Sequence, residues 1–352
     1  VESIVIEPFF DTLIAGEKSP FSFILNLDGD LPTSYEVKIG NFETTFVERA
    51  QWGRENVQII DRGDGYLTMT GEIVNLGSEW VSIKNLVGGV RDDAGTVLSV
   101  EKMGTYVSTL APSGDTNKLD RTPFSIKVPI PSSTATQWEI WCETEYRPTI
   151  TDNPLILETT NVYLDEYQSL HYVGTITNNS VFPLSSPIVA GLFAEDGSVM
   201  EVSYLLPVVP VPPGISIPFE ISNFGSYPWA SDQAALISTY RANIDPGKND
   251  TSNNIFELLA ENEVVEKVGL TWTIHGTFIN STQQNLEIVT SLISIYSNEN
   301  SLIAMGYGFS YPAEGTFIPG ASGEYEVIIY LPVNSDTYNI FSKTILLAVV
   351  IE

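Results

Sequence analysis

The chain has 352 residues, 43% of them hydrophobic, and a formal net charge of −28. Such a charge repels nucleic acid and anionic membrane surfaces, so both are excluded as partners. The single cysteine, Cys142, excludes a disulfide framework and a thiolate zinc site. No apolar run reaches the ~18 residues that a membrane-spanning helix needs, so we expect no membrane span in this chain.

Residues 1–48 have the pattern of the back half of a β-domain. The segment Leu13–Phe21 matches Val211–Phe219, and predicted strands follow at 21–27 and 35–39. Half a sandwich would leave an apolar face and a sheet edge uncovered. Three explanations stay open: the chain is a fragment of a longer protein, another polypeptide completes the half-domain by strand addition, or the segment folds onto the next domain.

Three similar segments follow, and we assign them as domains at 53–148, 149–255 and 256–352. Each contains a Gly-x-x-x-Asn opening, and the opening glycines are 103 and 102 residues apart. A turn with Gly or Asn follows the opening glycine after 24, 23 and 24 residues. The opening glycines and turn residues are Gly71 with Gly95, Gly174 with Gly197, and Gly276 with Asn300. Matched landmarks at matched offsets indicate tandem copies of one unit.

Alternating apolar residues and frequent turn signals predict an all-β protein without helices. About 100 residues per copy is the size of an immunoglobulin-like β-sandwich. The expected architecture is therefore a series of immunoglobulin-like β-sandwich domains in an elongated array, preceded by an incomplete half β-domain. We expect the strands to run along the array, at roughly 35–45 Å per domain.

The landmarks resemble those of FxLYD-type repeats, which occur in bacterial and archaeal extracellular surface proteins. The resemblance rests on the Gly-x-Val-x-Asn opening, the Asp-x-x-Gly turn and the Pro-Gly-x-x-x-Pro-Phe close. It covers most of the chain, and the segments Leu192–Asp196 and Ile295–Asn298 approximate the name-giving motif. It implies an immunoglobulin-like fold in an extracellular scaffold or adhesion setting, and it implies no catalytic residue.

Acidic residues gather in several predicted turns. Calcium needs six to eight oxygen ligands, which turn carboxylates and carbonyls supply. The candidate calcium ligands are Asp61, Asp64, Asp245 and Asp250. Asp also forms turns without a metal, so turn formation is the alternative for each of them. We expect no other cofactor.

Three N-glycosylation sequons begin at Asn178, Asn249 and Asn280, in predicted loops. Asn178 and Asn280 lie four residues after their opening glycines, and Asn75 occupies the same position without a sequon. The shared position favours a turn-capping role for the asparagine as part of the explanation.

The chain carries no local catalytic signature. His171 and His275 lie on separate predicted strands, and we expect both to be structural or surface residues. We therefore expect a non-enzymatic protein of the extracellular space or cell surface, such as a surface-layer, stalk or filament subunit. Its partners would be other copies of itself or other surface proteins, with polymerisation by β-strand addition through the N-terminal half-domain. The alternative is an adhesion or glycan-binding module that uses its inter-strand loops.

Overall fold

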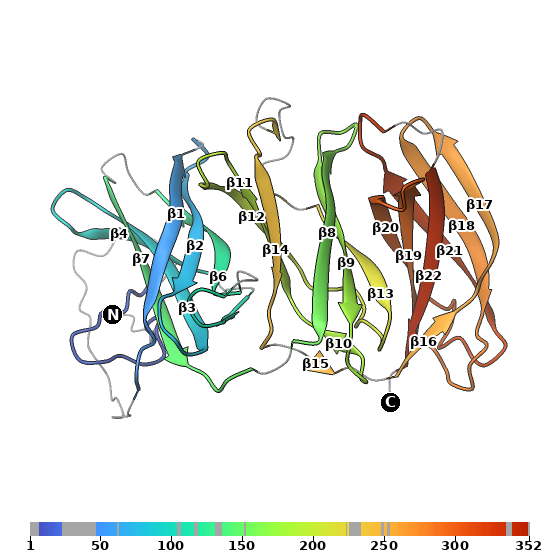
Figure 1. Cartoon of the computed structure of the whole chain (residues 1–352), viewed down its shortest axis with the longest axis horizontal. Helices are drawn as coiled ribbons and strands as arrows, with labels where there is room; N and C mark the ends of the chain where they lie inside the picture. Colours follow the sequence, from blue (N-terminus) through green and yellow to red (C-terminus); the bar gives the residue numbers. More distant parts are fainter. Residues whose placement is uncertain are drawn as a thin grey trace, which may run out of the picture. The chain divides into compact units, whose positions relative to one another are not determined.

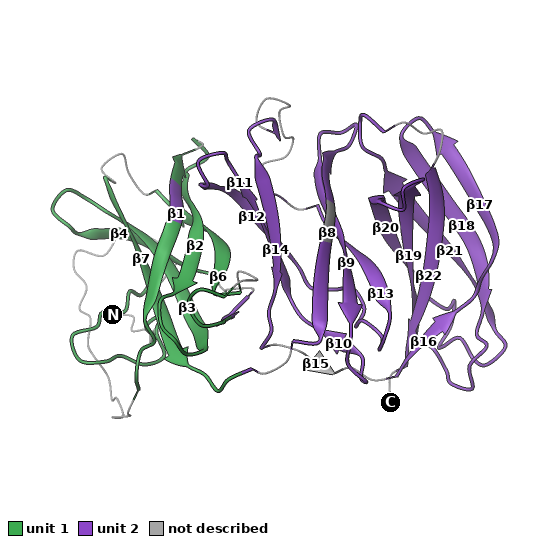
Figure 2. Cartoon of the chain, in the orientation of Figure 1, with its two compact units in different colours: residues 1–55, 59–105, 110–149 green, residues 56–58, 106–109, 150–352 purple. Residues whose placement is uncertain are grey.

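The computed structural model describes residues 7–22, 47–61, 63–103, 107–115, 119–130, 136–150, 153–222, 224, 234–247, 250–251, 254–335 and 340–350. Every secondary-structure element in these residues is a β-strand, which confirms the all-β class (Figure 1). In the same residues, no helix is long and apolar enough to cross a membrane. The chain divides into two compact units (Figure 2): residues 1–55, 59–105 and 110–149 form unit 1, and residues 56–58, 106–109 and 150–352 form unit 2.

The first sandwich, called sandwich 1, forms the body of unit 1. Its strands are β1 (Trp52–Asp61), β2 (Tyr66–Asn75), β3 (Val81–Arg91), β4 (Val97–Met103), β5 (Thr109–Leu110), β6 (Arg121–Pro129) and β7 (Gln137–Tyr146). One sheet has the order β1-β2-β6, and in the other β3 pairs with β4, β5 and β7. Gly88 of β3 lies close to Met69 and Ile126 of the opposite sheet. Both of these side chains are buried, so the core lies between the two sheets.

Unit 2 repeats this construction twice, as sandwich 2 and sandwich 3. The strands of sandwich 2 are β8 (Leu155–Leu164), β9 (Leu170–Asn178), β10 (Leu184–Ser185), β11 (Ile188–Phe193), β12 (Val199–Leu205), β13 (Ser216–Ile221), β14 (Thr239–Ile244) and β15 (Asp250–Thr251). Those of sandwich 3 are β16 (Ile255–Leu258), β17 (Ala260–Val268), β18 (Thr271–Ile279), β19 (Ile288–Ser297), β20 (Leu302–Ser310), β21 (Ser322–Tyr330) and β22 (Ile340–Val349). The main sheets are β8-β9-β13 and β12-β11-β14 in sandwich 2, and β17-β18-β21 and β16-β22-β19-β20 in sandwich 3. To within one residue, none of the sheets in the described residues combines strands from different predicted domains.

The predicted hairpin turn has one geometry in all three sandwiches. Gly95, Gly197 and Asn300 have positive φ angles of 81°, 83° and 60°. Each donates its main-chain N–H to the carbonyl three residues earlier, at 2.9–3.0 Å. The strand register also shifts shortly before each turn. Glycine and asparagine tolerate this left-handed conformation, so the turn residues alone specify the hairpins.

The opening glycines face aromatic residues on the neighbouring strand. Gly71 pairs with Phe124, Gly174 with Phe219, and Gly276 with Tyr325. A Cβ atom added at Gly174 would lie 2.7 Å from the Phe219 ring and 2.5 Å from a main-chain carbonyl. The aromatic ring therefore occupies the space of the absent side chain, which explains why glycine stands at this position.

Sandwiches 2 and 3 pack against each other through their sheet faces. Their buried apolar side chains form one continuous cluster from Leu155 to Val350. Contacts between β13 and β20, and between β20 and both β8 and β9, join the two sandwiches, whose layers stand next to each other in Figure 1. The expectation that strands run along the array is therefore wrong for these two sandwiches. The described strands pair within their own sandwich, whereas the apolar core continues from sandwich 2 into sandwich 3.

The predicted half-domain at 1–48 is described only in part. Its strands at 21–27 and 35–39 fall mostly or wholly outside the described residues, and residues 7–22 contain no strand. Gly16 has a φ of 86°, and Glu17 donates its N–H to the Ile14 carbonyl at 3.0 Å. The corresponding turn at Gly214, with a φ of 69°, has the same bond from Ile215 to Pro212. The match to the repeat thus extends to the geometry of this turn.

Candidate functional site

A buried carboxylate on the second sheet of sandwich 1 holds the N-terminal segment. Glu143 of β7 faces Asn85 of β3, and its side chain is fully buried. Its oxygens accept hydrogen bonds from the main-chain N–H groups of Asp11 and Thr12, each at 3.0 Å, and from the Thr12 hydroxyl at 2.9 Å. The Asn85 amide donates a further hydrogen bond. Glu143 therefore recognises two main-chain N–H groups and one hydroxyl of the N-terminal segment.

These bonds keep Glu143 ionised. Burial alone would raise the pKa of its carboxyl group. Hydrogen bonds from Asn85 and from the main chain of residues 11 and 12 outweigh burial, so the pKa of Glu143 lies below its ordinary value. A buried carboxylate that accepts charge-assisted hydrogen bonds is stable only while its donors stay in place. The N-terminal segment supplies three of those donors.

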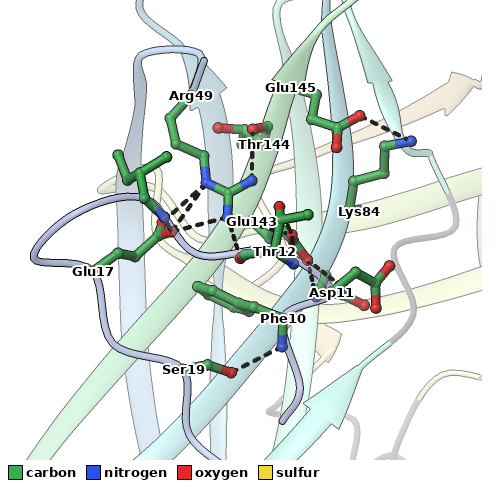
Figure 3. A network of polar contacts seen from close by, with 12 residues as sticks. Phe10, Asp11, Thr12, Glu17, Ser19, Arg49, Lys84, Glu143, Thr144 and Glu145 are labelled. Atoms are coloured by element: carbon green, nitrogen blue, oxygen red, sulfur yellow. Dashed lines mark hydrogen bonds and ion pairs between the residues drawn. The ribbon is translucent and has the colours of Figure 1, made fainter. Parts of the chain in front are cut away.

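Arg49 completes the site from the other side of the segment. Its Nη2 donates to the Thr12 carbonyl at 2.6 Å and pairs with Glu17 at 2.9 Å. The same nitrogen lies 3.3 Å from a carboxylate oxygen of Glu143. Figure 3 shows the guanidinium between Glu17 and Thr12. Arg49 and Glu143 thus bind the carbonyl and the N–H of one residue.

An apolar contact anchors the same segment. Phe10 is 2% exposed and packs against Val87 and Val100, with Trp141 at the edge of the cluster. Val87 pairs with Trp141 across β3 and β7, as Asn85 pairs with Glu143, so all four lie on one face of the sheet. This face binds a bend of the chain, at residues 9–11, through one aromatic side chain and two main-chain N–H groups.

The described part of residues 1–48 therefore lies on sandwich 1, as in the third of the three explanations. Glu143, Arg49 and Phe10 were not predicted as site residues from the sequence. The available signal was an acid that alternates with Trp141 on a strand rich in buried residues.

A second buried polar cluster lies in unit 2, around His171 of β9. Its Nδ1 contacts the Glu220 carboxylate, and its Nε2 lies 3.1 Å from Asp165. The ring stacks on Tyr163 at a centroid distance of 4.7 Å. Burial would lower the pKa of His171, but the bonds and charges of Glu220 and Asp165 raise it above its ordinary value. Both ring nitrogens are used, so the imidazole has no free nitrogen to act as a catalytic base.

The four calcium candidates do not form one site. Asp61 and Asp64 lie in an exposed turn of unit 1, where each caps a main-chain N–H, at 2.9 Å and 3.1 Å. Asp245 is fully buried in unit 2 and accepts two hydrogen bonds from Ser108. The side chain of Asp250 is outside the described residues. Among the described residues, no group of three His, Cys, Asp or Glu side chains is placed to hold a metal ion, and calcium binding stays a prediction.

The repeated asparagine is a buried structural residue. Asn280 is 1% exposed, and its Nδ2 donates to the carbonyls of Gln284 and Phe317 at 2.8 Å and 2.7 Å. Its Oδ1 accepts the N–H of Thr282 at 3.0 Å. The same three bonds form at Asn75 and Asn178. The predicted turn-capping role is confirmed.

This geometry argues against the predicted glycosylation of Asn178 and Asn280 in the folded chain. A glycan would replace a hydrogen of Nδ2 that is already donated to a carbonyl. It would also have to extend into solvent from a side chain that is buried. The remaining candidate, Asn249, lies outside the described residues.

A cleft of about 900 Å³ lies between sandwich 2 and sandwich 3 in unit 2. Polar side chains on its wall include Asn161, Asn298, Glu299, Asn334 and Ser335. The Ser335 hydroxyl is buried and has no hydrogen-bond partner among the described residues. These side chains place amide, hydroxyl and carboxylate groups around the cleft.

No protein-family model matches the chain, and no curated protein matches it. The resemblance to FxLYD-type repeats therefore stays a prediction.

Proposed function

We propose that the chain is a non-enzymatic structural protein of the cell surface, a subunit of a surface layer, stalk or filament. The observation that supports this most is the face-to-face packing of sandwiches 2 and 3, whose apolar cores are continuous. Neighbouring domains joined by a flexible linker usually share a smaller and more polar interface. Face-to-face packing of these two sandwiches suits a protein that transmits force or keeps a fixed spacing.

The distribution of buried polar groups supports the same function. The three asparagines at the opening of each sandwich, and the clusters around Glu143 and His171, hold turns, segments and neighbouring sandwiches in place. These buried polar groups therefore have structural roles. The proposal includes the immunoglobulin-like identity of the sandwiches and an extracellular location, where a net charge of −28 keeps a dense layer of protein soluble.

Polymerisation by strand addition through residues 1–48 is the assembly route that we propose. Its support is the sequence match of Leu13–Phe21 to the back half of a repeat, together with the Gly16 turn. A half-repeat exposes a sheet edge that another chain can pair with. Other copies of the chain, or other surface proteins, would be the partners.

Analytical ultracentrifugation and negative-stain microscopy of the full chain test this function. Regular stacks or filaments that grow with protein concentration are the expected result. A chain that stays monomeric at every concentration, with an ordered N-terminal segment, would contradict assembly.

The cleft between sandwiches 2 and 3 favours a second candidate function, adhesion through glycan binding. Its amide and hydroxyl groups suit sugar hydroxyls, which are both donors and acceptors. A glycan array probed with and without millimolar calcium tests it. Hits that disappear in an Asn161→Ala chain would support adhesion, and an array without hits in both conditions would refute it.

A further inference from the structure

We propose that the outer face of the β3-β4-β7 region is a peptide-binding site, and that it binds the 7–22 segment of a second copy as well as its own. The inference deepens the proposed self-assembly, on which its biological role rests, by naming a surface and a partner segment that is bound by side chains and adds no strand to a sheet. In the structure, residues 7–22 of the same chain occupy the site.

The ligand class follows from the contacts. Glu143 accepts two consecutive main-chain N–H groups, and Arg49 donates to the carbonyl of Thr12. The two N–H groups reach one carboxylate because the chain bends at residues 9–11, so recognition of this kind requires a bent peptide and no proline at either N–H. Phe10 fills the apolar part and the Thr12 hydroxyl adds one more bond. The site therefore fits a peptide that has an aromatic residue, then any residue with a main-chain N–H, then threonine.

The corresponding face of sandwich 3 is already covered by a sheet of sandwich 2. In sandwich 3, Leu292 pairs with Ile345 and Thr290 pairs with Leu347. These pairs correspond to Val87 with Trp141 and Asn85 with Glu143 in sandwich 1. Thr290, Leu292 and Leu347 are at most 2% exposed, and the β8-β9-β13 sheet contacts this part of sandwich 3. Sandwich 1 has Glu143 where sandwich 3 has Leu347. A carboxylate suits a ligand that presents free N–H groups, whereas leucine suits a sheet face whose N–H groups are already paired.

The attachment of the segment allows exchange between copies. Among the described residues, no main-chain to main-chain hydrogen bond joins residues 7–22 to a strand of sandwich 1. The segment is held by the groups around Glu143 and Arg49, by Phe10, and by a 3.4 Å contact from Lys102 to the Phe9 carbonyl. A segment held by a few side chains can leave one site and occupy an identical one, as in domain swapping. Exchange then depends on concentration, because a tethered segment competes at an effective concentration of about millimolar.

A labelled synthetic peptide of residues 7–22 tests the site. The receptor is the full chain with Phe10→Ala, which weakens its own segment, and fluorescence anisotropy reports binding. We expect saturable binding, and binding at least about tenfold weaker for a peptide with Thr12→Pro, which lacks the N–H that Glu143 accepts. Because that change is in the peptide, it leaves the folding of the receptor unaffected. Equal binding of the two peptides, or no saturable binding up to about 1 mM, would overturn the site.

Protein variants provide a matched comparison. The double variant with Phe10→Ala and Glu143→Gln should bind the peptide at least about tenfold more weakly than Phe10→Ala alone. Glu145→Gln in the same background removes a carboxylate two residues away, which pairs with Lys84 at the surface, and should leave the affinity unchanged. Loss of affinity in both double variants would mean that charge, and not the Glu143 contacts, carries the binding.

Exchange between copies needs its own measurement. A chain with Phe10→Ala retains an intact site, and a chain with Glu143→Gln retains an intact segment. We expect their mixture to form a 1:1 complex in sedimentation, while each alone stays monomeric at the same concentration. A mixture without the complex would overturn exchange. Assembly of the unmodified chain without peptide binding would refute this site and leave the structural function standing. Peptide binding without assembly would support this site and refute the structural function.

Discussion

The hydroxyl of Tyr163 in sandwich 2 donates a hydrogen bond of 3.1 Å to the carbonyl of Tyr330 in sandwich 3. The ring of the same Tyr163 stacks on His171, which is held between Glu220 and Asp165. The main-chain N–H of Val333 donates to Leu164, at 3.0 Å, beside this contact. The His171 cluster therefore supports the surface on which sandwich 3 rests.

The stability of unit 2 should depend on pH through His171. The pKa of His171 is raised in the folded chain above its ordinary value of 6.5, so folding favours the protonated form. The stabilisation is complete below pH 6.5 and is lost as pH rises through the folded pKa. We expect the unfolding temperature of unit 2 to fall over this range in calorimetry. His171→Gln should flatten the profile, and an identical slope in that variant would contradict the assignment.

Tyr163→Phe should weaken the contact between sandwiches 2 and 3. The change removes the hydrogen bond to the Tyr330 carbonyl but keeps the stacking on His171. We expect a loss of about 1–2 kcal/mol in the free energy of unfolding of unit 2 in urea. Tyr307→Phe, at a tyrosine that is 46% exposed on β20, provides the control and should change little. Equal effects of the two substitutions would show that the junction bond contributes nothing.

Asn280→Ala should be among the most destabilising single substitutions in sandwich 3. It leaves the buried carbonyl of Phe317, the carbonyl of Gln284, whose hydrogen bond is half-buried, and the N–H of Thr282 without their partner. We expect a cost of about 2–4 kcal/mol, measured by denaturant unfolding. Asn298→Ala, in an exposed turn of the same sandwich, should cost less than about 0.5 kcal/mol. A small effect at Asn280 would contradict the structural role of the repeated asparagine.

Gly174→Ala should disturb the sheet of sandwich 2. The new Cβ would lie 2.5 Å from the main-chain oxygen of Glu158, which cannot move without breaking the ladder. We expect faster amide exchange in peptides from β8, β9 and β13, read by hydrogen-exchange mass spectrometry. Gly77→Ala meets its nearest atom at 3.4 Å and should leave exchange unchanged. Unchanged protection of these strands in Gly174→Ala would refute the need for glycine at this position.

Local features of the fold were predictable from the sequence, but contacts between distant residues were not. The hairpins at Gly95 and Gly197 and the role of Asn280 depend on residues close in sequence or repeated at fixed offsets. The bond from Tyr163 to Tyr330 spans 167 residues, and the bond from Thr12 to Glu143 spans 131. Strand alternation shows that a side chain points out of a sheet, but it does not show whether solvent or another sheet covers that face. For this reason the expectation that strands run along the array was wrong for sandwiches 2 and 3.

The most direct measurement of the proposed function is immunogold electron microscopy of intact source cells, with an antibody raised against unit 2. A structural surface subunit predicts gold particles on the outer surface, in a regular array or along filaments. Label confined to the cell interior would contradict the proposal.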